Sequence, residues 1–288
     1  WSYYLSSPFN LIIILCAKTH LPMALNLIIS AKIILAALCF AYFLMHAGKK
    51  PVKNPGIIVF SLFYAFSSFV VGYYWNLMWL DCIFIFPVII LGMEKMFAGK
   101  DSRMYMLSLL YSFVCNYYIS FMICLFLILW FFTFHFRNIK DFLIKGIRFA
   151  VASLTTAAMG AVVLVPAYMG IMTTASAEFE LPEWEFYGSF ADTLRSHLFC
   201  SEVMTNQVGD SGTNLYCGLF TIFLGCMFFF MRKISLEKKI KYGLLLILLV
   251  ISFNDQKLNY IWHGFHNQYG IPNRFAFLYI FILLIMAY

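Results

Sequence analysis

An acidic residue at the end of an aromatic cluster is the first candidate for a reactive side chain. Asp81 follows the aromatic belt Tyr73–Trp79, at the predicted start of an apolar helix. A carboxylate there could bind a divalent metal ion such as Mg²⁺ or Mn²⁺, act as a general base, or orient a hydroxyl group. It could also stabilise the helix N-terminus through the macrodipole. Ionisable groups at membrane depth are costly and usually serve a site, so both interpretations stay open.

A second polar cluster lies near the end of the chain. His263 and His266 are three residues apart, Trp262 precedes them, and Arg274 heads the next apolar run. Arginine can clamp a phosphate through two parallel hydrogen bonds, although snorkelling to the membrane interface is the alternative role. For the histidines an acid–base or hydrogen-bonding role is favoured over metal binding, because no third ligand is specified.

Four more residues are candidate substrate-binding groups. Asn76 lies within the aromatic belt, and Asn116 and Tyr117 form the tip of a tight apolar hairpin. An aromatic ring at such a tip either stacks on a sugar or anchors the membrane interface. Lys32 lies inside an apolar run, where a lone charge costs at least ~2.5–3.5 kcal/mol. It therefore needs a partner on another helix or contact with a lipid phosphate.

The composition indicates a membrane protein. The 288 residues are 63% hydrophobic, 20% aromatic and only 11% charged, which excludes an ordinary soluble globule. The net charge of +7 is explained by loops that face anionic lipid, so no nucleic-acid partner is expected. The eight cysteines form no CxxC pair and are expected to be small buried hydrophobes.

The loops between the apolar runs are alternately basic and acidic, which predicts the topology. Fifteen of the 20 lysines and arginines lie on one set of loops: Lys49, Lys50, Lys53, Lys95, Lys100, Arg103, Arg137, Lys140, Lys145, Arg148, Arg232, Lys233, Lys238, Lys239 and Lys241. Positive charge stays on the cytoplasmic side, so these loops are predicted to be inner. Most acids fall on the other loops, and the active site is therefore expected to face outside.

The apolar runs predict an all-α, polytopic transmembrane bundle with about nine membrane passes, several of them short. The expected passes are 21–45, 56–72, 81–96, 104–115, 118–136, 146–170, 215–231, 242–253 and a last one from about 273. Residues 138–148 are expected to form an amphipathic connector on the inner surface. Residues 171–213 form a long extracytoplasmic loop. Residues 1–288 are expected to be one transmembrane domain, cut from a longer protein.

Several segments together resemble the YfhO family of bacterial membrane proteins. They are Leu5–Leu11, Asn76–Asp81, Asn116–Ile119, and the stretch from Asn259–Phe265 to Arg274–Phe275. The similarity runs across essentially the whole chain and in family order, which is more specific than any one motif.

The resemblance implies a GT-C-like glycosyltransferase in the bacterial cell membrane. Such an enzyme takes a sugar from a polyprenyl-phosphate donor and passes it to an extracytoplasmic polymer such as teichoic acid. The family's principal acid usually lies in the first outer loop. This chain is expected to begin inside or just after that loop, and therefore to lack the residue. Arg274 and the histidines would then hold the leaving phosphate, and Asp81 would support deprotonation of the acceptor or hold a divalent ion.

Two other functions stay open. A transporter or flippase of a lipid-linked substrate would need polar groups on both sides of the membrane and at its centre, where Lys32 is the clear charge. A non-catalytic assembly partner would depend on its helix faces rather than on its polar clusters. The transferase interpretation carries one specific expectation: Asp81 and Arg274 share a wet pocket that opens away from the cytosol.

Overall fold

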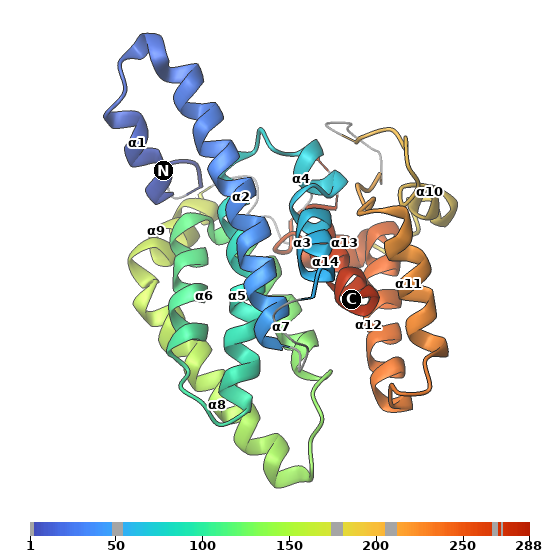
Figure 1. Cartoon of the computed structure of the whole chain (residues 1–288). Coiled ribbons are helices and arrows are strands. Elements are labelled where there is room, and N and C mark those ends of the chain that lie inside the picture. Colours follow the sequence, from blue (N-terminus) through green and yellow to red (C-terminus); the bar gives the residue numbers. More distant parts are fainter. Residues whose placement is uncertain (1–2, 48–53, 174–180, 205–211, 267–269, 272) are drawn as a thin grey trace. The chain divides into compact units, whose positions relative to one another are not determined.

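The computed structural model describes residues 3–47, 54–173, 181–204, 212–266, 270–271 and 273–288. Within these ranges the regular structure is helical, and the extended backbone is limited to one isolated antiparallel bridge between Phe186 and Asp255 (Figure 1). The predicted all-α class is confirmed for this part of the chain. The basic loop residues Lys49, Lys50 and Lys53 lie outside it.

The described residues divide into two compact units, each made of segments distant in sequence. The first unit comprises residues 1–61, 74–120 and 134–173. The second comprises residues 62–73, 121–133 and 174–288. Two helices, α3 (Gly56–Ala65) and α7 (Tyr117–Phe131), pass from one unit into the other along the chain. The prediction of one transmembrane domain stays a prediction.

The first unit is built on two long helices. Its elements are η1 (Pro8–Asn10), α1 (Leu11–Ile14), η2 (Lys18–His20), α2 (Leu21–Ala47), α5 (Leu77–Phe97), α6 (Arg103–Cys115), α8 (Ile139–Met159) and α9 (Ala161–Met172). Helix α5 packs against α2 on one side and α6 on the other, and α8 packs against α6 (Figure 1). Most of the α5 residues are buried, so this helix forms the core of the unit.

A glycine allows the close packing of α5 and α6. A Cβ atom on Gly92 would lie 2.6 Å from the backbone nitrogen of Tyr105, well inside contact distance. The two backbones therefore approach more closely than any other residue at this position would allow. Small residues commonly have this role where helices pack in membranes.

The second unit surrounds one apolar helix. Its elements are α4 (Ser68–Gly72), most of α7, α10 (Phe190–Arg195), α11 (Leu219–Phe230), α12 (Leu236–Asn254), α13 (Gln256–Trp262) and α14 (Ala276–Ala287). Helix α14 packs against α4, α11 and α12, and nearly all of its residues are buried. An apolar helix buried on all sides is typical of a bundle centre.

Among the described residues, three helical segments are long and apolar enough to cross a membrane. They are Lys18–Ala47, Leu77–Phe97 and Ile139–Met159. Shorter apolar helices cover Gly56–Gly72, Arg103–Cys115, Tyr117–Phe131, Ala161–Met172, Leu219–Phe230 and Ala276–Ala287. Most of these segments overlap the predicted passes in order. The predicted pass 242–253 lies within α12, which is not among them, and the number of passes stays a prediction.

Two expected boundaries were wrong. Residues 138–148 are not a separate connector, because α8 continues without a break from Ile139 to Met159. The side chain of Asn138 caps its start by accepting a hydrogen bond from the Asp141 backbone, and Gly160 follows its end. The predicted pass 146–170 is also wrong, because its residues belong to two helices, α8 and α9, which are separated at Gly160. The predicted pass 56–72 keeps its bounds, but it contains a break between α3 and α4, where Ser67 is extended and its hydroxyl donates to the Tyr64 carbonyl.

Candidate functional site

Asp81 is not at a helix start. Helix α5 begins at Leu77, four residues earlier than the sequence predicted, with Asn76 as its N-cap residue. Asp81 therefore lies in the second turn, beyond the reach of the orphan N–H groups, and the helix-terminus interpretation is wrong. Its side chain is fully buried, at 0% exposure, so it needs partners from neighbouring elements.

Lys32 is the charged partner. It projects from α2, and its Nζ lies 2.5 Å from Asp81 Oδ2 in an ion pair whose two side chains are fully buried. The same Nζ donates to the Leu77 carbonyl at 2.9 Å and lies 5.4 Å above the centre of the Phe9 ring. Lys32 thus has its partner on another helix, and the pair has no net charge, which lowers the cost of burial.

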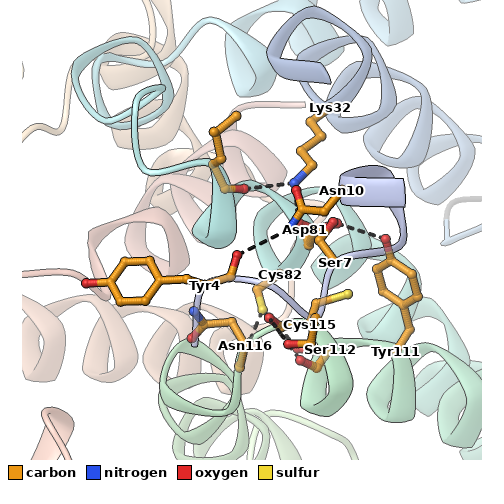
Figure 2. Close-up of polar contacts among 12 residues, drawn as sticks. Tyr4, Ser7, Asn10, Lys32, Asp81, Cys82, Tyr111, Ser112, Cys115 and Asn116 are labelled. Carbon is orange, nitrogen blue, oxygen red and sulfur yellow. Dashed lines mark hydrogen bonds and ion pairs between the residues drawn. The ribbon is translucent and has the colours of Figure 1, made fainter. Parts of the chain in front are cut away.

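Two hydroxyl groups complete the environment of the carboxylate. Ser7 Oγ donates to Asp81 Oδ1 at 3.0 Å, and Tyr111 Oη donates to the same oxygen at 2.9 Å (Figure 2). Three donors thus surround the carboxylate, and both of its oxygens are engaged. Because neither oxygen is open to an incoming hydroxyl, this arrangement suits positioning better than proton abstraction.

The N-terminal segment lies across this centre and is held by α5, α6 and α7. The Asn116 amide donates to the Tyr3 carbonyl at 3.2 Å, and Trp79 Nε1 donates to Tyr3 Oη at 3.0 Å. The Asn116 side-chain oxygen also accepts from Ile119 N at 2.9 Å, which caps α7. Tyr117 packs its ring edge-to-face against Tyr3 at 6.2 Å. These contacts place Ser7 over the ion pair.

A pocket opens beside the buried ion pair, within the first unit. Its volume is about 360 Å³, and the residues that line it are Tyr4, Ser7, Asn10, Lys32, Trp75, Asn76, Leu77 and Met78. Lys32 lines the pocket and has a side chain that is fully shielded from solvent. Asn76 is 4% exposed, and in the described part of the chain its amide nitrogen has no hydrogen-bond partner. Three predicted site residues, Lys32, Asn76 and Asp81, therefore gather here, because Asp81 bonds two of the lining residues. Asn116 and Tyr117 are not among the lining residues.

The C-terminal cluster forms a separate network in the second unit. Asn259 donates to Asn273 at 2.6 Å, and its carbonyl lies 2.8 Å from His263 Nδ1. Burial, and secondly the nearby Arg274 guanidinium, lower the pKa of His263 to about 3. The pKa of His266 is lowered in the same direction, mainly by burial. Both imidazoles are therefore neutral near pH 7.

The other two predicted residues of this cluster have defined contacts. Trp262 is buried and stacks on Phe275, with 4.7 Å between ring centres and an angle of 11°. Arg274 is half-buried and donates from Nε to the Ile271 carbonyl at 3.1 Å. Arg274 belongs to the second unit and Asp81 to the first, and the pocket predicted to join them stays a prediction.

The described residues do not form an evident divalent-metal centre. Among them, no group of three or more histidine, cysteine, aspartate or glutamate side chains lies close enough to hold an ion. Both Asp81 oxygens are bonded to donors, and the Lys32 ammonium beside them would repel a second cation. The surroundings of Asp81 therefore do not fit Mg²⁺ or Mn²⁺, and we derive no step through a metal ion.

Sequence reasoning missed three residues of this site. Ser7 and Asn10 lie in the segment Leu5–Leu11, which stood out through the family resemblance and not through its chemistry. No sequence pattern singled out Tyr111, because a tyrosine inside an apolar helix is usually a core residue or an anchor at the membrane interface. Its place one helix turn before Cys115 at the end of α6 brings its hydroxyl to Asp81.

The fold and the site thus define a helical membrane protein with a buried polar centre, in which a lysine and an aspartate are paired. Comparison with known families identifies it further: the family described as bacterial membrane protein YfhO matches residues 1–288. The chain belongs to the YfhO family, and its location is the bacterial membrane. No curated protein and no solved structure matches the chain significantly.

Proposed function

We propose that this chain is part of a membrane glycosyltransferase that takes its sugar from a polyprenyl-phosphate donor. The acceptor is an extracytoplasmic polymer of the cell envelope, such as teichoic acid. The observation that carries the proposal is the buried Lys32–Asp81 pair beneath a polar pocket. Charged groups inside apolar helices are costly and mostly serve a substrate or ion site. Membership of the YfhO family supports the same class of function.

The reaction requires one bond to form and another to break at the anomeric carbon. A hydroxyl oxygen of the acceptor bonds to that carbon, its proton passes to a base, and the polyprenyl phosphate leaves with the bonding electrons. We assign the leaving phosphate to Arg274, because a guanidinium matches phosphate geometry. The half-buried, neutral His266 is the assigned proton acceptor, and buried His263 has a structural role with Trp262.

Asp81 acts in this proposal as a positioning residue. Its negative charge fixes Lys32, Ser7 and Tyr111, and thereby the shape and polarity of the pocket. Asn116 and Tyr117 support it indirectly, because they hold the N-terminal segment against α6 and α7.

The ion pair can be tested in the full-length protein with three variants: Asp81→Asn, Lys32→Met, and the two combined. Removing one partner leaves an uncompensated buried charge and should cost about 3–5 kcal/mol of stability. The combined variant has no such charge, so its expression level and unfolding temperature should recover. Protein-dependent sugar on the envelope polymer should stay below about a tenth of normal in all three. The exposed α8 change Thr155→Ala is the control.

Normal sugar transfer by the recovered double variant would show that the pair only stabilises the fold. A vesicle assay separates the transferase from a flippase. A flippase would move a fluorescent lipid-linked sugar between leaflets without an acceptor, whereas a transferase would consume the donor only when the polymer is added.

A further inference from the structure

The polar groups of the pocket form an unusual set of hydrogen-bonding positions. Ser7 Oγ uses its proton to bond Asp81 Oδ1 at 3.0 Å. A hydroxyl donates one hydrogen bond and accepts two, so Ser7 can present only acceptor lone pairs to a ligand. Asp81 thus fixes the direction in which Ser7 bonds, although Asp81 itself does not line the pocket.

Asn10 offers a second acceptor. Its amide nitrogen donates one of its two protons to the Tyr4 carbonyl at 3.2 Å, and its side-chain oxygen is an acceptor that a ligand hydroxyl could bond (Figure 2). Asn76 offers the opposite polarity. Its buried amide nitrogen has no hydrogen-bond partner among the described residues, and a buried donor left unbonded is destabilising. A ligand oxygen in the pocket would satisfy it.

The positive charge of Lys32, which lines the pocket, is already paired with Asp81. Lys32 is the charged residue among the eight that line the pocket, and its Nζ bonds both Asp81 and the Leu77 carbonyl. A phosphate is an acceptor with negative charge, and it binds where free cations and donors converge. The acceptor atoms of Ser7 and Asn10, and a lysine whose charge is neutralised by Asp81, do not provide such a site.

A hydroxyl-rich ring fits these positions better. Its hydroxyl protons can bond Ser7 and Asn10, while a ring or hydroxyl oxygen accepts from Asn76. Tyr4 and Trp75 are exposed at the pocket and offer aromatic faces to the C–H groups of a sugar. The volume of about 360 Å³ is at the small end of the range for small-molecule sites, which suits one ring rather than a chain of sugars.

We propose that this pocket binds an uncharged sugar ring and that the phosphate of the donor lies outside it. Ser7 and Asn10 accept hydrogen bonds from ring hydroxyls, and Asn76 donates one to a ring oxygen. This proposal rests on the proposed sugar-transfer function and adds which part of the donor the pocket takes. Ser7, Asn10 and Asn76 then determine specificity for the sugar.

The test is ligand-observed NMR with the full-length protein in nanodiscs. The probes are butyl glycosides of glucose, galactose and N-acetylglucosamine, with butyl phosphate as the charged counterpart. At least one glycoside should show saturation transfer that the phosphate does not. Ser7→Ala and Asn76→Leu should each weaken that binding about three- to tenfold, as expected for one lost hydrogen bond. Thr155→Ala, which removes an exposed hydroxyl of the same unit, should leave it unchanged.

Asn76→Asp is a second variant for the case that Asn76→Leu does not fold. It keeps the size of the side chain but replaces the donor by an acceptor, so it should weaken glycoside binding as well. Binding of butyl phosphate in preference to every glycoside would overturn the proposal, as would glycoside binding that none of these variants affects, or no binding of any probe. Glycoside binding that depends on Ser7 and Asn76 in a protein without transfer activity would uphold the sugar site and reject the transferase function.

Discussion

At the scale of single residues, the decisive feature is that one carboxylate organises a whole polar centre. Asp81 accepts from Lys32, Ser7 and Tyr111, which come from α2, the N-terminal segment and α6. Desolvating an ion is expensive unless its partners are already in place. The arrangement therefore ties three parts of the first unit to one buried charge, and it sets the polarity of the adjoining pocket.

Buried His263 makes stability depend on pH. Its pKa is about 3 in the folded protein and near 6.5 when unfolded, so below pH 6.5 the unfolded chain binds a proton that the folded one does not. Its contribution is complete above pH 6.5 and is lost as the pH falls towards 3. Between pH 6.5 and 5 we expect a loss of about 1–2 kcal/mol in the free energy of unfolding.

Unfolding in detergent at a series of pH values measures this effect. His263→Gln should flatten the decline, whereas the same change at exposed His20 should not. A His263→Gln variant with an unchanged slope would assign the acid sensitivity to other groups.

At the scale of helices, close approach depends on particular small residues. α5 and α6 pack so tightly that Gly92 faces the backbone of Tyr105, and this packing brings Tyr111 within reach of Asp81. The break at Gly160 likewise ends α8 where Leu110 and Phe113 of α6 lie within contact distance of an added Cβ. These helix contacts thus fix the positions of the side chains that form the polar centre.

Gly92→Ala and Gly170→Ala form a matched pair. An alanine at position 92 would overlap the α6 backbone and should destabilise by about 1–3 kcal/mol. At position 170 in α9 no atom lies within 4 Å of the added Cβ, so alanine should stabilise the helix by about 0.5–1 kcal/mol. The unfolding temperatures in detergent give both values. Equal effects at the two positions would show that helix propensity, not the contact with Tyr105, decides.

At the scale of the whole molecule, the charges of the loops predict how the chain is oriented in the membrane. The connection between α5 and α6 carries Lys100 and Asp101, and Arg103 begins α6, whereas the segment before α10 carries Glu183 and Glu185. Positive loops are retained on the cytoplasmic side. Glu178 and Glu180 of the predicted long outer loop lie outside the described residues.

Cysteine labelling tests this orientation. In a background with exposed Cys200 and Cys226 replaced by alanine, Glu183→Cys should react with a membrane-impermeant maleimide in intact cells. Asp101→Cys should react only after the cells are permeabilised, because its loop is predicted to be cytoplasmic. Labelling of both in intact cells, or the reverse pattern, would contradict the proposed outward-facing site.

The sequence by itself determined the class and the order of the elements. Hydrophobic runs long enough to exclude water must become helices, because a lipid phase leaves every backbone N–H and C=O to be satisfied within the helix. It also singled out Asp81 and Lys32 as charges that need a partner or a site, since buried charges in such runs are rare. The start of α5 was missed by four residues, because aromatic residues fit a helix or an interfacial turn equally well.

Only the tertiary structure decided what the polar residues contact. Lys32 and Asp81 are 49 positions apart, and Ser7 is 74 positions from Asp81, so no local pattern predicts their hydrogen bonds. The pairing follows from the packing of α2, α5 and α6, which depends on side-chain shape across the helix interfaces and not on periodicity along each helix. The same packing left the buried Asn76 amide nitrogen unbonded among the described residues that line the pocket, and it surrounded Asp81 with three donors.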